Sequence, residues 1–318
     1  MRFALALLAA MAAVAQVPSP ALLVLNKEGS LAIVDPASRK VLGTVRTGES
    51  PHEAVASDDG KLAFVSNYGG ATPGNSLSVI DLAARKELHR VDLGPLRRPH
   101  GLAFAGGKLY FTAELNKLIG RYDPEANQVD WLLGTGQATT HMIMVSPDLK
   151  QMYTANIGSD SITILDAAGV QNWNETVVPV GKGPEGFDIT PDGKQLWAAN
   201  SRDGTISVID IYGKRVVRTF SVQTKRSNRL KFTPDGRLVL ISDLDAGDLL
   251  VLERDTRKEL KRMKLGHSPA GILVTPDSAR AYVAVTGDNE VAEIDLKRLE
   301  LLARIRTGTG PDGMAWVK

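Results

Sequence analysis

Three of the five histidines in the chain stand at matching places in short, similar segments. His52 lies in SPHEAV, His100 in RPHGLA and His141 in TTHMIM, with spacings of 48 and 41 residues. Neutral imidazoles are common ligands of transition metals, and a pKa of about 6.5 also suits them to proton transfer. The residue type and spacing therefore indicate metal binding, acid–base chemistry or recognition of an anionic ligand.

The equivalent position of the repeated segment is occupied by other residue types further along the chain. It holds Glu185, Asn228, Ala270 and Asp312 in turn. We therefore expect a ligand site made of His52, His100, His141, Glu185, Asn228, Arg229 and Asp312. A divalent transition metal would use His52, His100, His141 and Glu185. The alternative that needs no ligand is that each Pro-His pair caps the start of a strand, with the imidazole bonded to neighbouring backbone.

Repeats in the sequence show which elements must position these side chains. VSPDLKQMYTANIGSDSITILD from Val145 and ITPDGKQLWAANSRDGTISVID from Ile189 are two of several related units. Each unit alternates apolar and polar residues in four short runs separated by turn residues, a pattern typical of four-stranded units. Four-stranded units of about 40–45 residues predict a β-propeller.

Counting the units predicts an all-β, seven-bladed propeller that forms a single domain over residues 16–318. Six units are complete, while the C-terminal GPDGMAWVK matches only a first strand and the N-terminal ALLVLNKEGSLAIVD region matches only the other three. We expect Met314 to Val317 to pair beside Leu22 to Asn26 and close the ring, which removes exposed sheet edges. The matching places then surround one mouth of a central channel.

The segments YTANIGSDSITILD and WAANSRDGTISVID resemble the repeat of the YVTN-type, YncE-like seven-bladed propellers. FVSNYGG with the Pro-His pairs is similar, more distantly, to the lactonase propellers of the 6-phosphogluconolactonase kind. The resemblance implies the fold and leaves the chemistry open, because propellers carry many activities. We expect a binding module for a small anionic or sugar-like molecule, or for a protein or cell-surface partner. The alternative is a lactone hydrolase or lyase that uses the histidines, with or without a metal.

The N-terminal residues and the composition indicate where the protein acts. Residues 1–15, MRFALALLAAMAAVA, have the basic start, apolar run and Ala-Val-Ala end of a cleaved signal peptide, so we expect a periplasmic or secreted protein without a membrane anchor. The chain has no cysteine, which excludes disulfides and thiolate metal sites. A net charge of +2 and 5% aromatic residues do not favour nucleic-acid binding. We expect a monomer.

Other polar residues are expected around the same mouth. The loops that enter the first strands carry Arg97, Arg98, Lys182, Lys225, Arg226 and His267. The loops between second and third strands carry Asn67, Tyr68, Glu114, Asn156, Asn200, Arg202 and Asp243. This number of basic side chains predicts an anion-attracting funnel at the mouth. The alternative is a rim of solvated polar side chains that bind no ligand. The long loop 67–75 could lean over the mouth beside His52.

Overall fold

The computed structural model describes residues 19–169 and 172–318. The expected signal peptide, residues 1–15, lies outside the described residues. Within the described part, no helix is long and apolar enough to cross a membrane.

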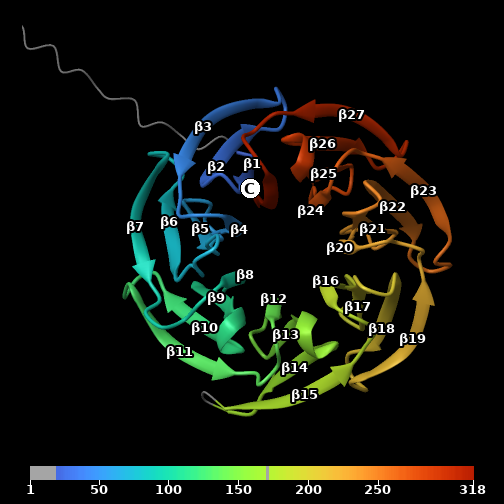
Figure 1. Ribbon diagram of the computed structural model, residues 1–318, viewed down its shortest axis with the longest axis horizontal. Coiled ribbons are helices and arrows are strands. Elements are labelled where there is room, and N and C mark those ends of the chain that lie inside the picture. The colour runs from blue at the N-terminus through green and yellow to red at the C-terminus, as the bar shows by residue number, and fades with distance from the viewer. Residues whose placement is uncertain (1–18, 170–171) are drawn as a thin grey trace, which may run out of the picture.

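Seven antiparallel sheets of four strands each surround a central axis, as the repeats predicted (Figure 1). The innermost strands are β28 (Pro311–Val317), β4 (Pro51–Ala56), β8 (Pro99–Ala105), β12 (Thr140–Val145), β16 (Pro184–Ile189), β20 (Ser227–Phe232) and β24 (Pro269–Val274). The second strands are β1 (Ala21–Asn26), β5 (Leu62–Asn67), β9 (Lys108–Ala113), β13 (Gln151–Asn156), β17 (Gln195–Asn200), β21 (Leu238–Asp243) and β25 (Arg280–Val285).

The third strands are β2 (Ser30–Asp35), β6 (Ser76–Asp81), β10 (Leu118–Asp123), β14 (Ser161–Ala167), β18 (Thr205–Asp210), β22 (Asp248–Glu253) and β26 (Glu290–Asp295). The outer strands are β3 (Lys40–Arg46), β7 (Lys86–Asp92), β11 (Gln128–Gly134), β15 (Trp173–Pro179), β19 (Arg215–Ser221), β23 (Glu259–Lys264) and β27 (Glu300–Ile305). Three short 3₁₀ helices, η1 (Glu114–Asn116), η2 (Ile157–Ser159) and η3 (Thr286–Asp288), follow second strands. We number the blades 1 to 7, from the sheet of β28 and β1–β3 to the sheet of β24–β27.

The two ends of the chain complete blade 1 together, which confirms the predicted closure. Strand β28 pairs with β1 so that Ala21 lies opposite Val317 and Leu23 lies opposite Ala315. Each blade therefore has four strands, and its innermost strand borders the axis.

Apolar side chains between neighbouring blades form the core. Phe64, Leu77 and Val79 of blade 2 pack against Leu109 and Phe111 of blade 3, and all five are buried. Fully burying an aliphatic or aromatic side chain of this size stabilises a fold by about 1.5–3 kcal/mol. Similar clusters lie between the other blades, so apolar packing positions the innermost strands.

A β-bulge interrupts every innermost strand near its start. In blade 2, Pro51 pairs with Asn67 but Ala54 pairs with Val65, so His52 and Glu53 together oppose Ser66. The same register shift occurs in the other six blades. A bulge redirects side chains locally, and here it lets two successive side chains approach the channel.

The side chains at the end of the second strands mostly have a structural role, contrary to the prediction that they face the mouth. Asn67 is buried, and its Nδ2 donates to the hydroxyls of Ser76 (3.1 Å) and Ser78 (3.0 Å). Asn156 makes the equivalent bonds to Ser161 and Thr163. These amides tie the second strand to the third because buried polar groups need partners.

Candidate site at the histidine mouth

The three repeated histidines lie in adjacent blades, each as the second residue of its innermost strand. The sequence placed them just ahead of these strands, but the strands begin earlier because pairing continues past the bulge. The Nδ1 of His52 lies 3.1 Å from the Nε2 of His100. The rings of His100 and His141 are 3.7 Å apart between centroids and tilted by 34°. The fold therefore gathers all three imidazoles into one cluster.

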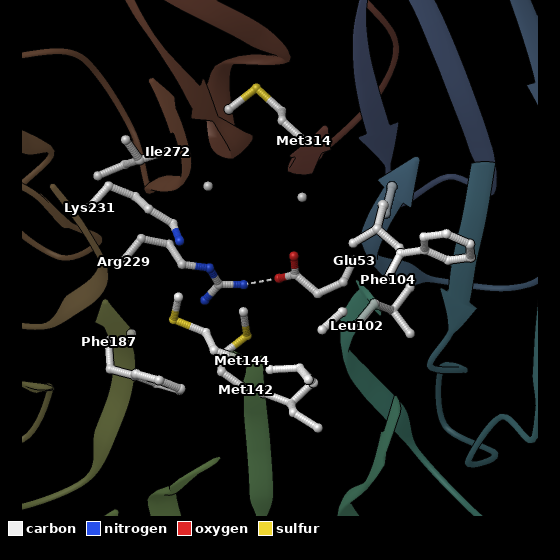
Figure 2. Close-up of a pocket in the computed structure, with 18 residues that line it drawn as sticks. Glu53, Leu102, Phe104, Met142, Met144, Phe187, Arg229, Lys231, Ile272 and Met314 are labelled. Carbon is white, nitrogen blue, oxygen red and sulfur yellow. Dashed lines mark hydrogen bonds and ion pairs between the residues drawn. The ribbon is translucent and has the colours of Figure 1, made fainter. Parts of the chain in front are cut away.

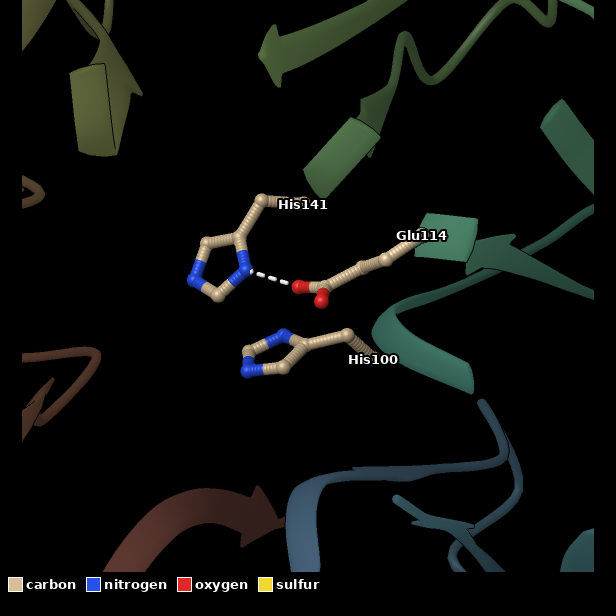
Figure 3. Close-up of side chains that lie close together, drawn as sticks. All are labelled: His100, Glu114 and His141. Carbon is tan, nitrogen blue, oxygen red and sulfur yellow. Dashed lines mark hydrogen bonds and ion pairs between the residues drawn. The ribbon is translucent and has the colours of Figure 1, made fainter. Parts of the chain in front are cut away.

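Two further residues complete this cluster. Glu114, the first residue of η1, places Oε1 2.5 Å from the Nδ1 of His141 (Figure 3). Its Oε2 accepts a hydrogen bond from the Tyr68 hydroxyl at 2.7 Å. The Tyr68 ring in turn stacks on His52, with 4.3 Å between centroids. Loop 67–75 therefore does cover His52, as its length suggested, and Arg98 donates to the Gly70 carbonyl of this loop at 3.2 Å.

The sequence had placed Tyr68 and Glu114 on this face but not in the site. Both directly follow a second strand, β5 and β9 respectively. That shared place is the pattern that could have identified them.

Two nitrogens of the cluster are buried without a hydrogen-bond partner. They are the Nδ1 of His100 and the Nε2 of His141. Because the Glu114 carboxylate only accepts, the Nδ1 of His141 carries the hydrogen of this contact, which leaves its Nε2 directed elsewhere. Burial lowers the pKa of His52 to about 4 and holds the pKa of His100 well below its ordinary value. His52 and His100 are therefore neutral near pH 7, and each has one ring nitrogen with a lone pair.

The backbone beneath His141 depends on a glycine in the neighbouring blade. A Cβ on Gly101 would lie 2.5 Å from the carbonyl oxygen of His141. The N–H of Gly101 donates to the hydroxyl of Thr112 (2.9 Å), which donates to the same carbonyl at 2.6 Å. Blades 3 and 4 are thus close enough to stack the two histidine rings.

His100, Glu114 and His141 could hold a metal ion. One ligand atom from each lies within 4.8 Å of the others, and all three residues are buried. Glu185, which the sequence assigned to the metal set, has another partner, because its carboxylate accepts a hydrogen bond from the Asn228 amide at 2.5 Å. Among the described residues, Glu114 is the carboxylate that lies beside the histidine pair.

Asp312 lies on the other side of His52. Its Oδ2 is 3.0 Å from the Lys27 amine and 3.9 Å from the Nδ1 of His52. Burial opposes its ionisation, but Lys27, His52 and Arg229 outweigh burial and lower the pKa of Asp312. It therefore stays charged.

One residue deeper, an ion pair crosses the channel between Glu53 of blade 2 and Arg229 of blade 6 (Figure 2). Both residues are buried. Burial opposes the charge on Arg229, but Glu53, Asp312 and Glu185 together outweigh it and raise its pKa. The pair forms a crossbar over the channel, in which the Arg229 guanidinium is engaged by the Glu53 carboxylate.

Basic side chains of the rim also have acidic partners, so the expected anion-attracting funnel is weaker than the sequence suggested. Lys182 pairs with Asp160 at 2.8 Å, and the exposed His267 pairs with Asp288 at 2.7 Å. Around the cluster, the carboxylates of Glu53, Glu114, Glu185 and Asp312 outnumber the cations of Lys27, Arg98 and Arg229. Arg202, Lys225 and Arg226 line a separate hollow of about 410 Å³ beside Glu185 and Asp245.

Comparisons with known proteins agree with this architecture. Hydrazine synthase from Kuenenia stuttgartiensis is 23% identical with a TM-score of 0.73, covering 83% of this chain and 89% of that one. A putative 6-phosphogluconolactonase from Bacteroides uniformis is 16% identical with a TM-score of 0.76, covering 94% and 99%. The periplasmic gluconolactonase of Pseudomonas aeruginosa is 15% identical with a TM-score of 0.76, covering 94% and 99%.

At these identities the solved structures establish the fold alone. No curated protein matches the chain. A family model described as a YNCE-like beta-propeller matches residues 115–280. The chain, with its seven closed blades and its YVTN-type repeat, belongs to the YNCE-like β-propeller family.

Proposed function

We propose that the protein binds a divalent transition-metal ion at the channel mouth through His100, His141 and Glu114, with His52 completing the set from the more exposed side. The observation that carries this proposal is the pair of buried, unpartnered imidazole nitrogens on His100 and His141. A buried polar atom without a partner costs about 1–3 kcal/mol. A metal ion removes that cost by accepting a lone pair.

The spacing of the side chains supports this ligand. The ligand atoms lie within 4.8 Å of one another, whereas ligands of a tetrahedral ion at about 2.1 Å are about 3.4 Å apart. Small side-chain movements would bring the ligand atoms to this separation. Glu114 would then bind the ion directly, or remain hydrogen-bonded to His141 and orient its ring.

The charges around the cluster also favour a cation over an anionic molecule. Lys27 and Arg229 pair with Asp312 and Glu53, and the guanidinium of Arg98 lies 4.4 Å from the centre of the Tyr68 ring. The unpartnered atoms that remain are imidazole nitrogens, which are common ligands of metal ions.

The test uses untagged protein stripped with a chelator and titrated with Zn²⁺ and Cu²⁺ by calorimetry, with elemental analysis of the product. We expect one equivalent of bound metal, at least tenfold weaker binding in His100→Ala and His141→Ala, and about 10–100-fold weaker binding in Glu114→Gln. His267→Ala is the matched control, because this exposed histidine lies outside the cluster. Absence of stoichiometric metal, or equal affinity in all variants, would refute the proposal.

Hydrolysis of a lactone is the second candidate, favoured by the contact between His141 and Glu114. Glu114 orients His141 so that its Nε2 could take a proton from water. The water oxygen would add to the lactone carbonyl carbon, the ring C–O bond would break, and His141 would return the proton to the leaving oxygen. Because the Nε2 has essentially no exposed surface, a lactone would first have to displace its neighbours.

The assay for this candidate is release of acid from gluconolactone in a pH-stat. Turnover that disappears in His141→Gln and persists in His267→Gln would support hydrolysis. A rate equal to the spontaneous one would eliminate it.

A further inference from the structure

The part of the channel beyond the crossbar has a different character from the histidine mouth. On the side of Glu53 and Arg229 remote from the histidines, a cavity of about 280 Å³ follows the innermost strands. Its walls are mainly apolar side chains, drawn in Figure 2: Leu102, Phe104, Met142, Met144, Phe187, Ile272 and Met314. Polar atoms, among them those of Glu53, Arg229 and Lys231, contribute about as much of the exposed lining as apolar atoms, so the cavity can receive both an apolar chain and a polar group.

The cavity is continuous in its lining with a second hollow nearer the opposite mouth. That hollow, of about 410 Å³, shares Val55, Phe104, Ile272 and Met314 with the cavity and adds Trp316. Together they have the size of small-molecule sites, and their lining combines apolar side chains with polar groups. Methionine side chains adapt readily to the shape of an apolar guest.

One cation lines both hollows. Lys231 lies two residues after Arg229 on β20, and Figure 2 shows both side chains directed toward the centre of the ring. The Lys231 amine is 3.7 Å from an oxygen of Asp188. Asp188 is largely engaged elsewhere, because its carboxylate accepts the backbone N–H groups of Phe232 (2.9 Å) and Ile189 (3.1 Å). Lys231 is therefore only weakly paired, and 34% of its side-chain surface is exposed, so its amine can pair with an anion in the channel.

We propose that this half of the channel binds a linear apolar molecule with one anionic head group, of the class of medium-chain carboxylic acids. The chain occupies the space among Phe104, Ile272 and the methionines, and the carboxylate pairs with Lys231. The crossbar limits the depth of the site. It is a second site, separate from the histidine mouth and independent of whether a metal binds there.

The experiment titrates the protein by calorimetry with decanoate below its micelle-forming concentration. Decanol, which lacks the charge, and decyltrimethylammonium, which reverses it, are the comparison probes. We expect decanoate to bind about five to ten times more tightly than decanol, and the cation not to bind. Lys231→Gln should remove the preference for decanoate and leave decanol unchanged, whereas Lys194→Gln, at an exposed lysine in the turn between β16 and β17, should change neither.

A second variant tests the location of the chain. Met314→Trp fills the cavity and should abolish binding of both decanoate and decanol, with circular dichroism confirming that the variant is folded. His100→Ala should leave decanoate binding intact, which separates this site from the proposed metal site. No binding of decanoate, or an affinity unchanged in Lys231→Gln, overturns the proposal.

Discussion

Removal of Arg229 is expected to destabilise the ring more than removal of its partner Glu53. Arg229 is buried and faces three carboxylates, those of Glu53, Asp312 and Glu185, whereas Glu53 has Arg229 as its paired cation. In Arg229→Met, the Glu53 carboxylate stays buried without its cation, which costs about 3–5 kcal/mol in the free energy of unfolding. In Glu53→Gln, the guanidinium keeps its other two carboxylates, and the cost should be about 1–3 kcal/mol.

The double variant Glu53→Gln/Arg229→Met gives the sharpest test. Replacing both members of a buried pair leaves no uncompensated charge within the pair, so the cost of the double variant should fall below the sum of the two single costs by at least about 2 kcal/mol. Urea unfolding followed by tryptophan fluorescence and circular dichroism measures these values, with coincident transitions required. Costs that simply add, or an Arg229→Met cost below about 1 kcal/mol, would show that the crossbar is not a buried ion pair in solution.

Three further outcomes follow from the structure. Gly101→Ala should lower the free energy of unfolding, measured in urea, by about 1–3 kcal/mol because its Cβ would crowd the His141 carbonyl. Gly134→Ala is the control, because a Cβ there meets no neighbour within 4 Å. Equal effects of the two substitutions would contradict the close approach of Gly101 to the His141 carbonyl. In chelator-treated protein, the pKa of His52, about 4 when folded against 6.5 otherwise, means that the unfolded chain takes up the proton first as pH falls. The free energy of unfolding should therefore drop by up to about 3 kcal/mol between pH 6.5 and 4. The contribution of His52 to this drop should be missing in His52→Gln. Parallel pH profiles of the two proteins would refute the lowered pKa of His52. Deletion of residues 311–318 removes β28 and leaves the edge of β1 unpaired, so size-exclusion chromatography should show aggregates, whereas a soluble monomer would count against ring closure.

Repetition made most of the fold predictable. The alternating runs and the Pro-Asp-Gly turns recur often enough to give seven blades, and the unequal ends of the chain gave the pairing of β28 with β1. The common phase of His52, His100 and His141 located them on adjacent innermost strands. Each of these inferences depends on the position of a residue within its repeat unit, and this position can be read directly from the sequence.

Contacts between distant positions were harder to foresee. Glu53 and Arg229 are 176 residues apart, and no repeat pattern pairs two particular blades across the channel. The sequence does contain one sign of this pair. Glu53 and Arg229 are the one acid and the one base at their position of the repeat; the other blades have uncharged residues there, namely Gly101, Met142, Gly186, Gly271 and Gly313. Glu114 was missed as a ligand because the turn into η1, and not a strand phase, brings it to His141.

The crossbar has a mechanical consequence. In a repeat protein each unit contacts only its neighbours, so contacts do not usually link distant units. Glu53 and Arg229 join two blades that are not neighbours, so their ion pair links opposite sides of the channel directly. Moving these two blades apart would separate opposite charges that are buried from solvent, which disfavours that motion. A guest arriving from either end therefore meets an aperture of nearly constant width, and we expect selection by size more than by induced fit.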